Sequence, residues 1–170
     1  MHIINATLED ARAVAEIHVL SWQHAYRGIL PQDFLESLSV EKREAVWREQ
    51  ISRGSPDLLV AKSQNQLGGF VCFGASRDEG APAGTAEIMA IYLAPAMLST
   101  GLGRRLWLSA LDRMIDRGFT SVTLWVLVRN DRAIRFYEAA GFSADPASRK
   151  HFSLGGAVVE EIRYAREIPG

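Results

Sequence analysis

The sequence has a single cysteine, no long apolar run and almost no net charge. Because Cys72 is the only cysteine, an internal disulfide framework is excluded, and a reducing, cytoplasmic setting is expected. No apolar stretch approaches the ~20 residues that cross a bilayer. The first residues lack the basic and then apolar pattern of a signal peptide, so we expect none. The formal net charge of −1 gives no overall field for nucleic acid or an anionic membrane, and we expect neither as a partner.

The length and the histidine spacing limit the organisation further. A chain of 170 residues fits one domain with a sizeable core, and we expect residues 1–170 to form it. The loop 76–84 is rich in glycine, alanine, proline and charge, but it is too short to separate two domains. The four histidines show no metal-ligand spacing, so no metal is expected. Of these, His24 alone is a candidate for lining an acceptor site.

Hydrophobic periodicity and turn residues predict alternating helices and strands. Glycines at 68 and 69 predict a bulge, and residues 64–66 predict a hairpin turn. The order of elements predicts a mixed sheet with helices on its faces, hence an α/β or α+β fold. The expected strands are 2–5, 57–62, 67–75, 85–93, 121–128, 142–154 and 157–166, and the expected helices are 8–24, 32–38, 40–51, 102–116 and 131–140.

A glycine turn joins the strand 85–93 to the helix 102–116. A helix N-terminus offers unpaired N–H groups and the positive end of a dipole, and glycine lets an anion approach the backbone closely. The turn therefore predicts a pyrophosphate site, although a tight strand-to-helix connection explains the glycines alone equally well. Leu106 stands where a dinucleotide-binding motif would have its third glycine. The residues expected at this site are Leu98, Ser99, Thr100, Gly101, Leu102, Gly103 and Arg104.

In its context, this turn resembles the carrier-binding motif of the GNAT superfamily of N-acetyltransferases, Q/R-x-x-G-x-G/A. The resemblance extends to the strand ending at 92–95, to residues 22–31 and to the block 130–142. It implies a mostly antiparallel sheet of about seven strands with helices on both faces, and acetyl-CoA as co-substrate. Leu98 departs from the motif's Gln or Arg, which should weaken carrier binding, and Arg104 or Arg105 would compensate.

The block 130–142 resembles the family's second marker, an asparagine, a helix bearing a tyrosine, and then Gly-Phe. Asn130 can cap the helix, and the resemblance also assigns it a contact with CoA. Tyr137 lies two turns further along the same helix face. The resemblance makes Tyr137 a carrier contact and the acid that protonates the leaving thiolate, whereas a packing role with a solvated hydroxyl is the alternative.

The amine acceptor must lose a proton before or during attack. Glu87 lies on the strand that leads to the glycine turn, and in one branch of the family a glutamate there is the base. A solvated or arginine-paired carboxylate, or a water chain as base, are equal alternatives. By the same resemblance, Ile91 and Leu93 should offer backbone groups to the carrier, and a bulge near Ile91 would open the strand edge. Cys72 is expected to be a buried, inert thiol.

The acceptor pocket should lie where the first two helices meet the sheet. Trp22, Tyr26 and Trp125 are the aromatic residues expected to bind the acceptor, and core packing is the stronger alternative for Trp22. The predicted function is direct transfer of an acetyl group from acetyl-CoA to a primary amine of a small molecule or peptide. A CoA-binding protein with little or no catalytic activity is the alternative, and a homodimer is compatible with the sequence.

Overall fold

A central seven-stranded sheet organises the computed structural model, which describes residues 1–64 and 66–170. Its strand order is β1-β2-β3-β4-β5-β7-β6, and every neighbouring pair is antiparallel except β4 and β5. The strands are β1 (His2–Asn5), β2 (Asp57–Ser63), β3 (Gln66–Ala75), β4 (Thr85–Leu93), β5 (Ser121–Leu127), β6 (Ser143–Leu154) and β7 (Ala157–Glu167). The helices are α1 (Ala11–Ala25), α2 (Gln32–Glu36), α3 (Val40–Arg53), α4 (Leu102–Asp116) and α5 (Asp131–Ala139), with short 3₁₀ turns at Leu8–Asp10 and Pro95–Met97.

The observed elements confirm the predicted fold class, and most boundaries agree within two residues. The predicted helix 8–24 divides into a 3₁₀ turn and α1. The bulge expected at the glycine pair is present, because Ala61 pairs with Gly69 whereas Lys62 pairs with Leu67. The turn expected at 64–66 includes residue 65, which lies outside the described residues. Within the described residues, no helix is both long and apolar enough to cross a membrane.

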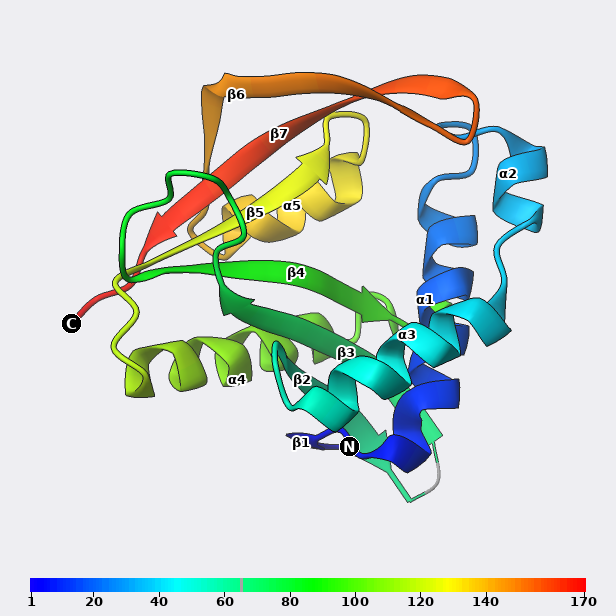
Figure 1. Cartoon of the computed structure of the whole chain (residues 1–170), viewed down its shortest axis with the longest axis horizontal. Coiled ribbons are helices and arrows are strands. Elements are labelled where there is room, and N and C mark those ends of the chain that lie inside the picture. The colour runs from blue at the N-terminus through cyan, green and yellow to red at the C-terminus, as the bar shows by residue number, and fades with distance from the viewer. Residues whose placement is uncertain (65) are drawn as a thin grey trace.

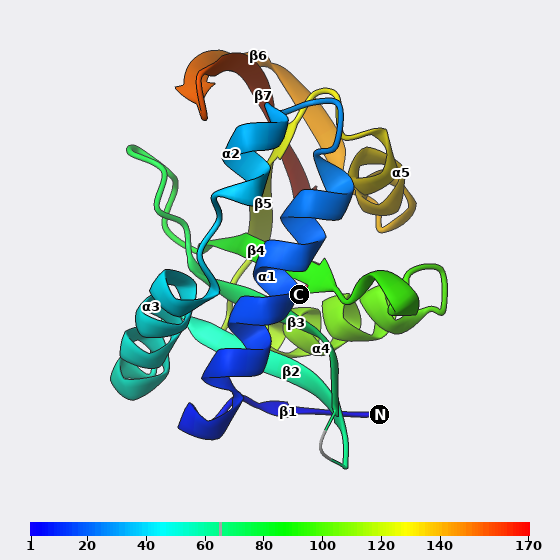
Figure 2. The same cartoon turned by 90° about the vertical axis from the view of Figure 1, so that its right-hand side faces the viewer.

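The helices cover the two faces of the sheet separately (Figure 2). On one face, α4 and α5 pack against a core that includes Leu106, Met114, Leu124 and Ile162. On the other face, α1 and α3 pack against β2 and β3, and α2 lies against the ends of β5 and β7. Alternate residues of a strand face opposite sides. Each strand therefore contributes side chains to both helical layers.

The pairing between β4 and β5 is short. It joins Thr85 to Ser121, Ala86 to Val122 and Glu87 to Thr123, and beyond these residues the two strands diverge (Figure 1). The register of β4 with β3 also shifts, because Cys72 pairs with Ala90 whereas Phe73 pairs with Ile88. A bulge therefore lies at Met89, two residues before the position expected from the sequence. The result is a wedge-shaped opening in the sheet.

A histidine lies in the buried layer between α1 and β4. His18 is 9% exposed. Its Nδ1 accepts a hydrogen bond from Trp47 Nε1 at 3.2 Å, and its ring stacks on Tyr92 at a centroid distance of 5.2 Å. Burial, together with the positive charge of Arg43, lowers the pKa of His18 from 6.5 to about 4. The folded protein therefore holds this imidazole in its neutral form.

The free energy of unfolding should consequently depend on pH through His18. Between the unfolded pKa of 6.5 and the folded pKa of about 4, the unfolded chain binds a proton that the folded chain does not. Stability is thus fully present above pH 6.5 and is lost as pH falls, by about 3 kcal/mol from this group. Urea unfolding of wild type and His18→Gln at several pH values checks this. An identical pH dependence in both proteins would contradict it.

Candidate active site

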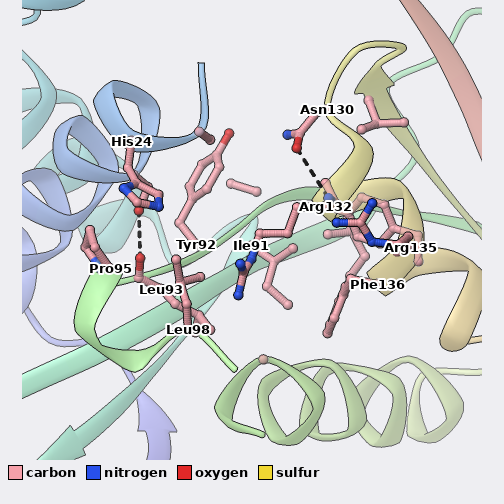
Figure 3. Close-up of a pocket in the computed structure, with 18 of the residues that line it drawn as sticks. His24, Ile91, Tyr92, Leu93, Pro95, Leu98, Asn130, Arg132, Arg135 and Phe136 are labelled. Atoms are coloured by element: carbon pink, nitrogen blue, oxygen red, sulfur yellow. Dashed lines mark hydrogen bonds between the residues drawn. The ribbon is translucent and has the colours of Figure 1, made fainter. Parts of the chain in front are cut away.

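A cleft of about 660 Å³ opens where β4 and β5 diverge. It runs between the end of α1, the exposed edge of β4, the start of α4 and one side of α5 (Figure 3). This volume is within the range that holds small molecules. The predicted site residues that line it are Tyr26, Ile91, Leu93, Leu98, Ser99, Gly101, Gly103, Arg104, Trp125, Asn130 and Tyr137.

The glycine turn forms one end of the cleft. Gly101 caps α4 with φ +85°, a left-handed conformation that favours glycine. Gly103 packs closely against α5, since a Cβ there would lie 3.2 Å from Phe136 Cε2. The first N–H groups of α4 have no partner within the helix, and its positive dipole end faces the same region. This end of the cleft therefore suits an anion such as a pyrophosphate.

Two arginines that were not predicted as site residues add positive charge to the cleft. Arg132 and Arg135 lie on α5 and line the cleft beside Phe136 (Figure 3). Arg132 Nη2 donates to Ser99 Oγ at 2.8 Å, which ties α5 to the glycine turn. Their i, i+3 spacing directly after Asn130 places them on one helix face. From this spacing, both arginines could have been predicted to lie on the same side of the helix.

The predicted hydroxyl contact of Thr100 needs correction, and two other side chains at the glycine turn also have partners outside the cleft. The Thr100 hydroxyl donates to the Met97 carbonyl at 2.6 Å and does not line the cleft. Leu102 is 3% exposed and packs into the core under α4, so only its backbone faces the turn. Of the two arginines expected to compensate for Leu98, Arg105 bonds to the Met1 carbonyl at 2.8 Å. Arg104 alone of the pair lines the cleft.

The edge of β4 forms the long wall of the cleft. Residues 88–93 pair with β3 on one side only, since the pairing with β5 ends at Glu87. Alternate backbone N–H and C=O groups of this stretch therefore face the opening. The Leu93 carbonyl accepts a hydrogen bond from the Ser21 hydroxyl at 2.9 Å. Opposite, Asn130 Oδ1 accepts from the Ala133 N–H at 3.3 Å and caps α5, as the sequence predicts.

Three tyrosines, Tyr26, Tyr92 and Tyr137, line the cleft. Burial raises the pKa of Tyr137 well above its usual value, and the neighbouring Tyr92 adds to the shift. Burial likewise raises the pKa of Tyr26, with further contributions from Tyr92 and Tyr137. All three phenols therefore stay protonated at neutral pH. Tyr137, which packs against Phe136 and Phe142, is thus able to donate a proton into the cleft.

Trp22 does not line the cleft, which corrects its assignment as an acceptor contact. Its indole Nε1 donates to the Tyr92 hydroxyl at 3.0 Å. Its ring meets Tyr26 edge to face, with centroids 5.0 Å apart. Trp22 therefore contacts two tyrosines that line the cleft without lining it itself. His24, on the last turn of α1, does line the cleft, above the end of β4 (Figure 3).

The position of Glu87 does not support its assignment as the base. Its side chain is 2% exposed and is not among the groups that line the cleft. Its Oε1 accepts from the Arg77 N–H at 2.9 Å, and its Oε2 accepts from Arg77 Nη2 at 2.6 Å. The arginine-paired alternative therefore describes Glu87 correctly. The position of Glu87 on the strand could be predicted from the sequence, whereas its partner Arg77, ten residues earlier, could not.

Cys72 lies in the hydrophobic layer under α1 and α3. It is 2% exposed, and Gln50 Nε2 contacts its Sγ at 3.2 Å. Burial raises the pKa of the thiol to about 11, so almost no thiolate forms at neutral pH. The structure agrees with the predicted inert thiol. Among the described residues, no group of three or more His, Cys, Asp or Glu side chains is arranged to hold a metal.

Comparisons with known proteins agree with this geometry. YuaI of Bacillus subtilis, named an uncharacterized N-acetyltransferase, is 32% identical over 158 residues, covering 92% of this chain and 87% of that protein. The spermidine N(1)-acetyltransferase of Thermoplasma acidophilum is 27% identical over 159 residues, covering 91% and 95%. The crystal structure of the PaiA N-acetyltransferase of Thermoplasma acidophilum, in complex with coenzyme A, superposes with a TM-score of 0.74 at 25% identity, covering 94% and 96%.

The sequence model of the Acetyltransferase (GNAT) family matches residues 22–142. This range contains the glycine turn, the exposed edge of β4 and the α5 tyrosine, all of which line the cleft. The fold, the cleft and the relatives therefore lead to one conclusion: the chain belongs to the Acetyltransferase (GNAT) family of N-acetyltransferases.

Proposed function

We propose that this chain, acting as one domain over residues 1–170, transfers the acetyl group of acetyl-CoA directly to a primary amine of a small molecule or peptide. One observation carries the proposal: the N-terminal end of a helix, an unpaired strand edge and a protonated tyrosine lie around one cavity. The relative from Thermoplasma acidophilum whose structure holds coenzyme A supports the choice of carrier.

The residues at the glycine turn fit the phosphates of the carrier. The backbone N–H groups at the start of α4 would bind the pyrophosphate, and Arg104, Arg132 and Arg135 would balance its charge. Since Leu98 supplies no polar group, the binding energy at this end comes from the backbone and the arginines. The exposed edge of β4 around Ile91 and Leu93, together with Asn130, would hold the arm of the carrier.

Acetyl-CoA supplies an activated thioester when it is bound. In the transfer, the amine nitrogen bonds to the acyl carbon, the carbon–sulfur bond breaks, and the leaving sulfur takes a proton. Tyr137 is the proton donor in this proposal, because its raised pKa keeps the phenol protonated. An N–H of β4 near Ile91 would stabilise the developing oxyanion. Because Glu87 is buried and paired, we assign removal of the amine proton to water.

The charge of the cleft suggests which amines it accepts. The charged or titratable lining residues that the structure describes, apart from tyrosines, are His24, Arg104, Arg132 and Arg135, and no carboxylate is among them. A polyamine would bring a second positive charge without a partner here. The aromatic walls Tyr26 and Trp125 instead suit the uncharged body of a monoamine. We therefore infer a monoamine acceptor with an apolar or aromatic body.

A thiol-release assay with acetyl-CoA and a panel of amines tests the function. The panel contains aromatic monoamines, amino acids, peptides with a free N-terminus, aminoglycosides and spermidine. We expect turnover of at least one monoamine, with a kcat/KM at least about tenfold above that of spermidine. Preference for spermidine would contradict the charge argument. CoA binding in calorimetry without turnover of any amine would instead identify the alternative, a CoA-binding protein without catalytic activity.

Arg104→Ala should weaken CoA binding about 5- to 20-fold, because it removes a charge-assisted contact of roughly 1–2 kcal/mol. Arg105→Ala is the matched control. It changes the neighbouring arginine, which bonds to Met1 and does not line the cleft, and should alter the affinity less than about twofold. Calorimetry with CoA measures both. Equal effects of the two substitutions would show that only the general charge of the helix end matters.

Tyr137→Phe should lower kcat about 100-fold, because the leaving sulfur loses its proton donor. The dissociation constant of CoA should change little, since the ring remains. Tyr164→Phe is the control: it removes a buried phenol that contacts Glu138 outside the cleft, at 3.4 Å. Steady-state kinetics and CoA calorimetry provide the two readouts. Unchanged kcat in Tyr137→Phe would remove the acid role.

A further inference from the structure

An ion pair with a buried carboxylate anchors the loop 76–84 to the middle of the sheet. Glu87 accepts hydrogen bonds from Arg77 Nη2 at 2.6 Å and from the Arg77 backbone N–H at 2.9 Å. The start of the loop is also held by the Ser76 N–H, which donates to the Thr85 carbonyl at 2.9 Å. Glu87 is 2% exposed, whereas the Arg77 side chain is 65% exposed. The carboxylate of Glu87 thus fixes the position of the first residues of the loop.

The next residue of the loop holds a wall of the cleft. Asp78 Oδ1 accepts a hydrogen bond from Trp125 Nε1 at 2.9 Å, and Asp78 Oδ2 accepts from Arg163 Nη1 at 3.5 Å. The loop, which joins β3 to β4, therefore extends over β5 to β7, and it is the green segment in front of these strands in Figure 1. Asp78 therefore connects the part of the loop that Glu87 fixes to Trp125, which lines the cleft.

Trp125 lies on the face of the sheet away from the glycine turn. Its neighbours Leu124 and Val126 belong to the core under α4, so alternation along β5 places Trp125 on the side of α1 and α2. Lys150 Nζ lies 4.1 Å from the centroid of its indole ring. The ring is thus held at its Nε1 edge by Asp78 and across one face by Lys150. This leaves a flat, fixed surface at the acceptor end.

We propose that Glu87 and Asp78 are positioning residues, which orient Trp125 for the amine acceptor through the loop 76–84. The proposal rests on the proposed acetyltransferase function. In it, Glu87 acts on the acceptor pocket through Arg77 and Asp78 and exchanges no proton with the amine. Loss of either carboxylate frees the indole, and the acceptor binds less tightly, whereas the carrier end of the cleft is unaffected.

Kinetics of Asp78→Ala and Glu87→Gln test the proposal with the preferred amine of the panel. Each substitution should raise KM for the acceptor about 5- to 10-fold, the effect of one lost hydrogen bond. The values of kcat and of KM for acetyl-CoA should change less than about twofold, and the pH profile should keep its shape. Asp78→Asn retains an acceptor oxygen for the indole and should restore most of the acceptor affinity.

Glu160→Ala is the matched control. Glu160 also pairs with an arginine near these strands, Arg149 at 2.7 Å, but has no hydrogen bond to Trp125 or Asp78, so KM for the acceptor should stay within about twofold. The double variant Asp78→Ala, Glu87→Gln should be no weaker than Asp78→Ala alone, because both act through one path. A large fall in kcat and a flattened pH profile in Glu87→Gln, with normal KM in Asp78→Ala, would overturn the proposal and make Glu87 the base.

The indole N–H resonance of Trp125 gives a readout that does not depend on acetyl transfer. Trp125→Phe assigns the signal in a ¹⁵N-labelled protein. Asp78→Ala and Glu87→Gln should both shift it, whereas Glu160→Ala should leave it in place. If no amine is turned over, these shifts still test the positioning role, and the failure belongs to the proposed function. An unshifted signal in Glu87→Gln would overturn the link between the ion pair and the cleft. Asp78→Ala, which changes a loop residue, keeps the test usable if Glu87→Gln does not fold.

Discussion

The structure depends on the early end of the pairing between β4 and β5. Three residue pairs join these strands, and the bulge at Met89 turns the remainder of β4 away. A sheet that stayed paired along both strands would have no cleft, because every backbone group would be bonded and the side chains would close over it. The divergence leaves the backbone of residues 88–93 unpaired on one side. It also lets α4 and α5 present their N-terminal ends to the same cavity.

Positively charged side chains concentrate in the cleft, although the chain as a whole is nearly neutral. Arg104 on α4 and Arg132 and Arg135 on α5 line the cleft. Near its other end, the carboxylates of Glu87, Asp78 and Asp145 are paired with arginine. The cleft therefore has a positive end and an aromatic end. This polarity sets the direction in which an anionic carrier and an amine would meet.

Much of the fold could be predicted from the sequence, because periodicity and glycine positions report local structure directly. The strand 85–93, the helix 102–116 and the bulge at the glycine pair are where the pattern predicts them. Most of the predicted cleft residues also line it, since a strand–turn–helix unit fixes their relative positions. What the sequence could not provide is the partner of a side chain. Glu87 and Trp22 lie on the expected elements, but their hydrogen-bond partners come from other parts of the chain. Arg77 binds the carboxylate of Glu87, and the Tyr92 hydroxyl accepts the hydrogen bond of Trp22.

The order of the strands has a consequence for assembly. The strands β1–β4 come from one continuous stretch of chain and β5–β7 come from a second, and the short pairing between β4 and β5 joins the two halves of the sheet. The cleft lies on the boundary between the two halves. It exists only when both halves are in place, so the binding surface belongs to neither half alone.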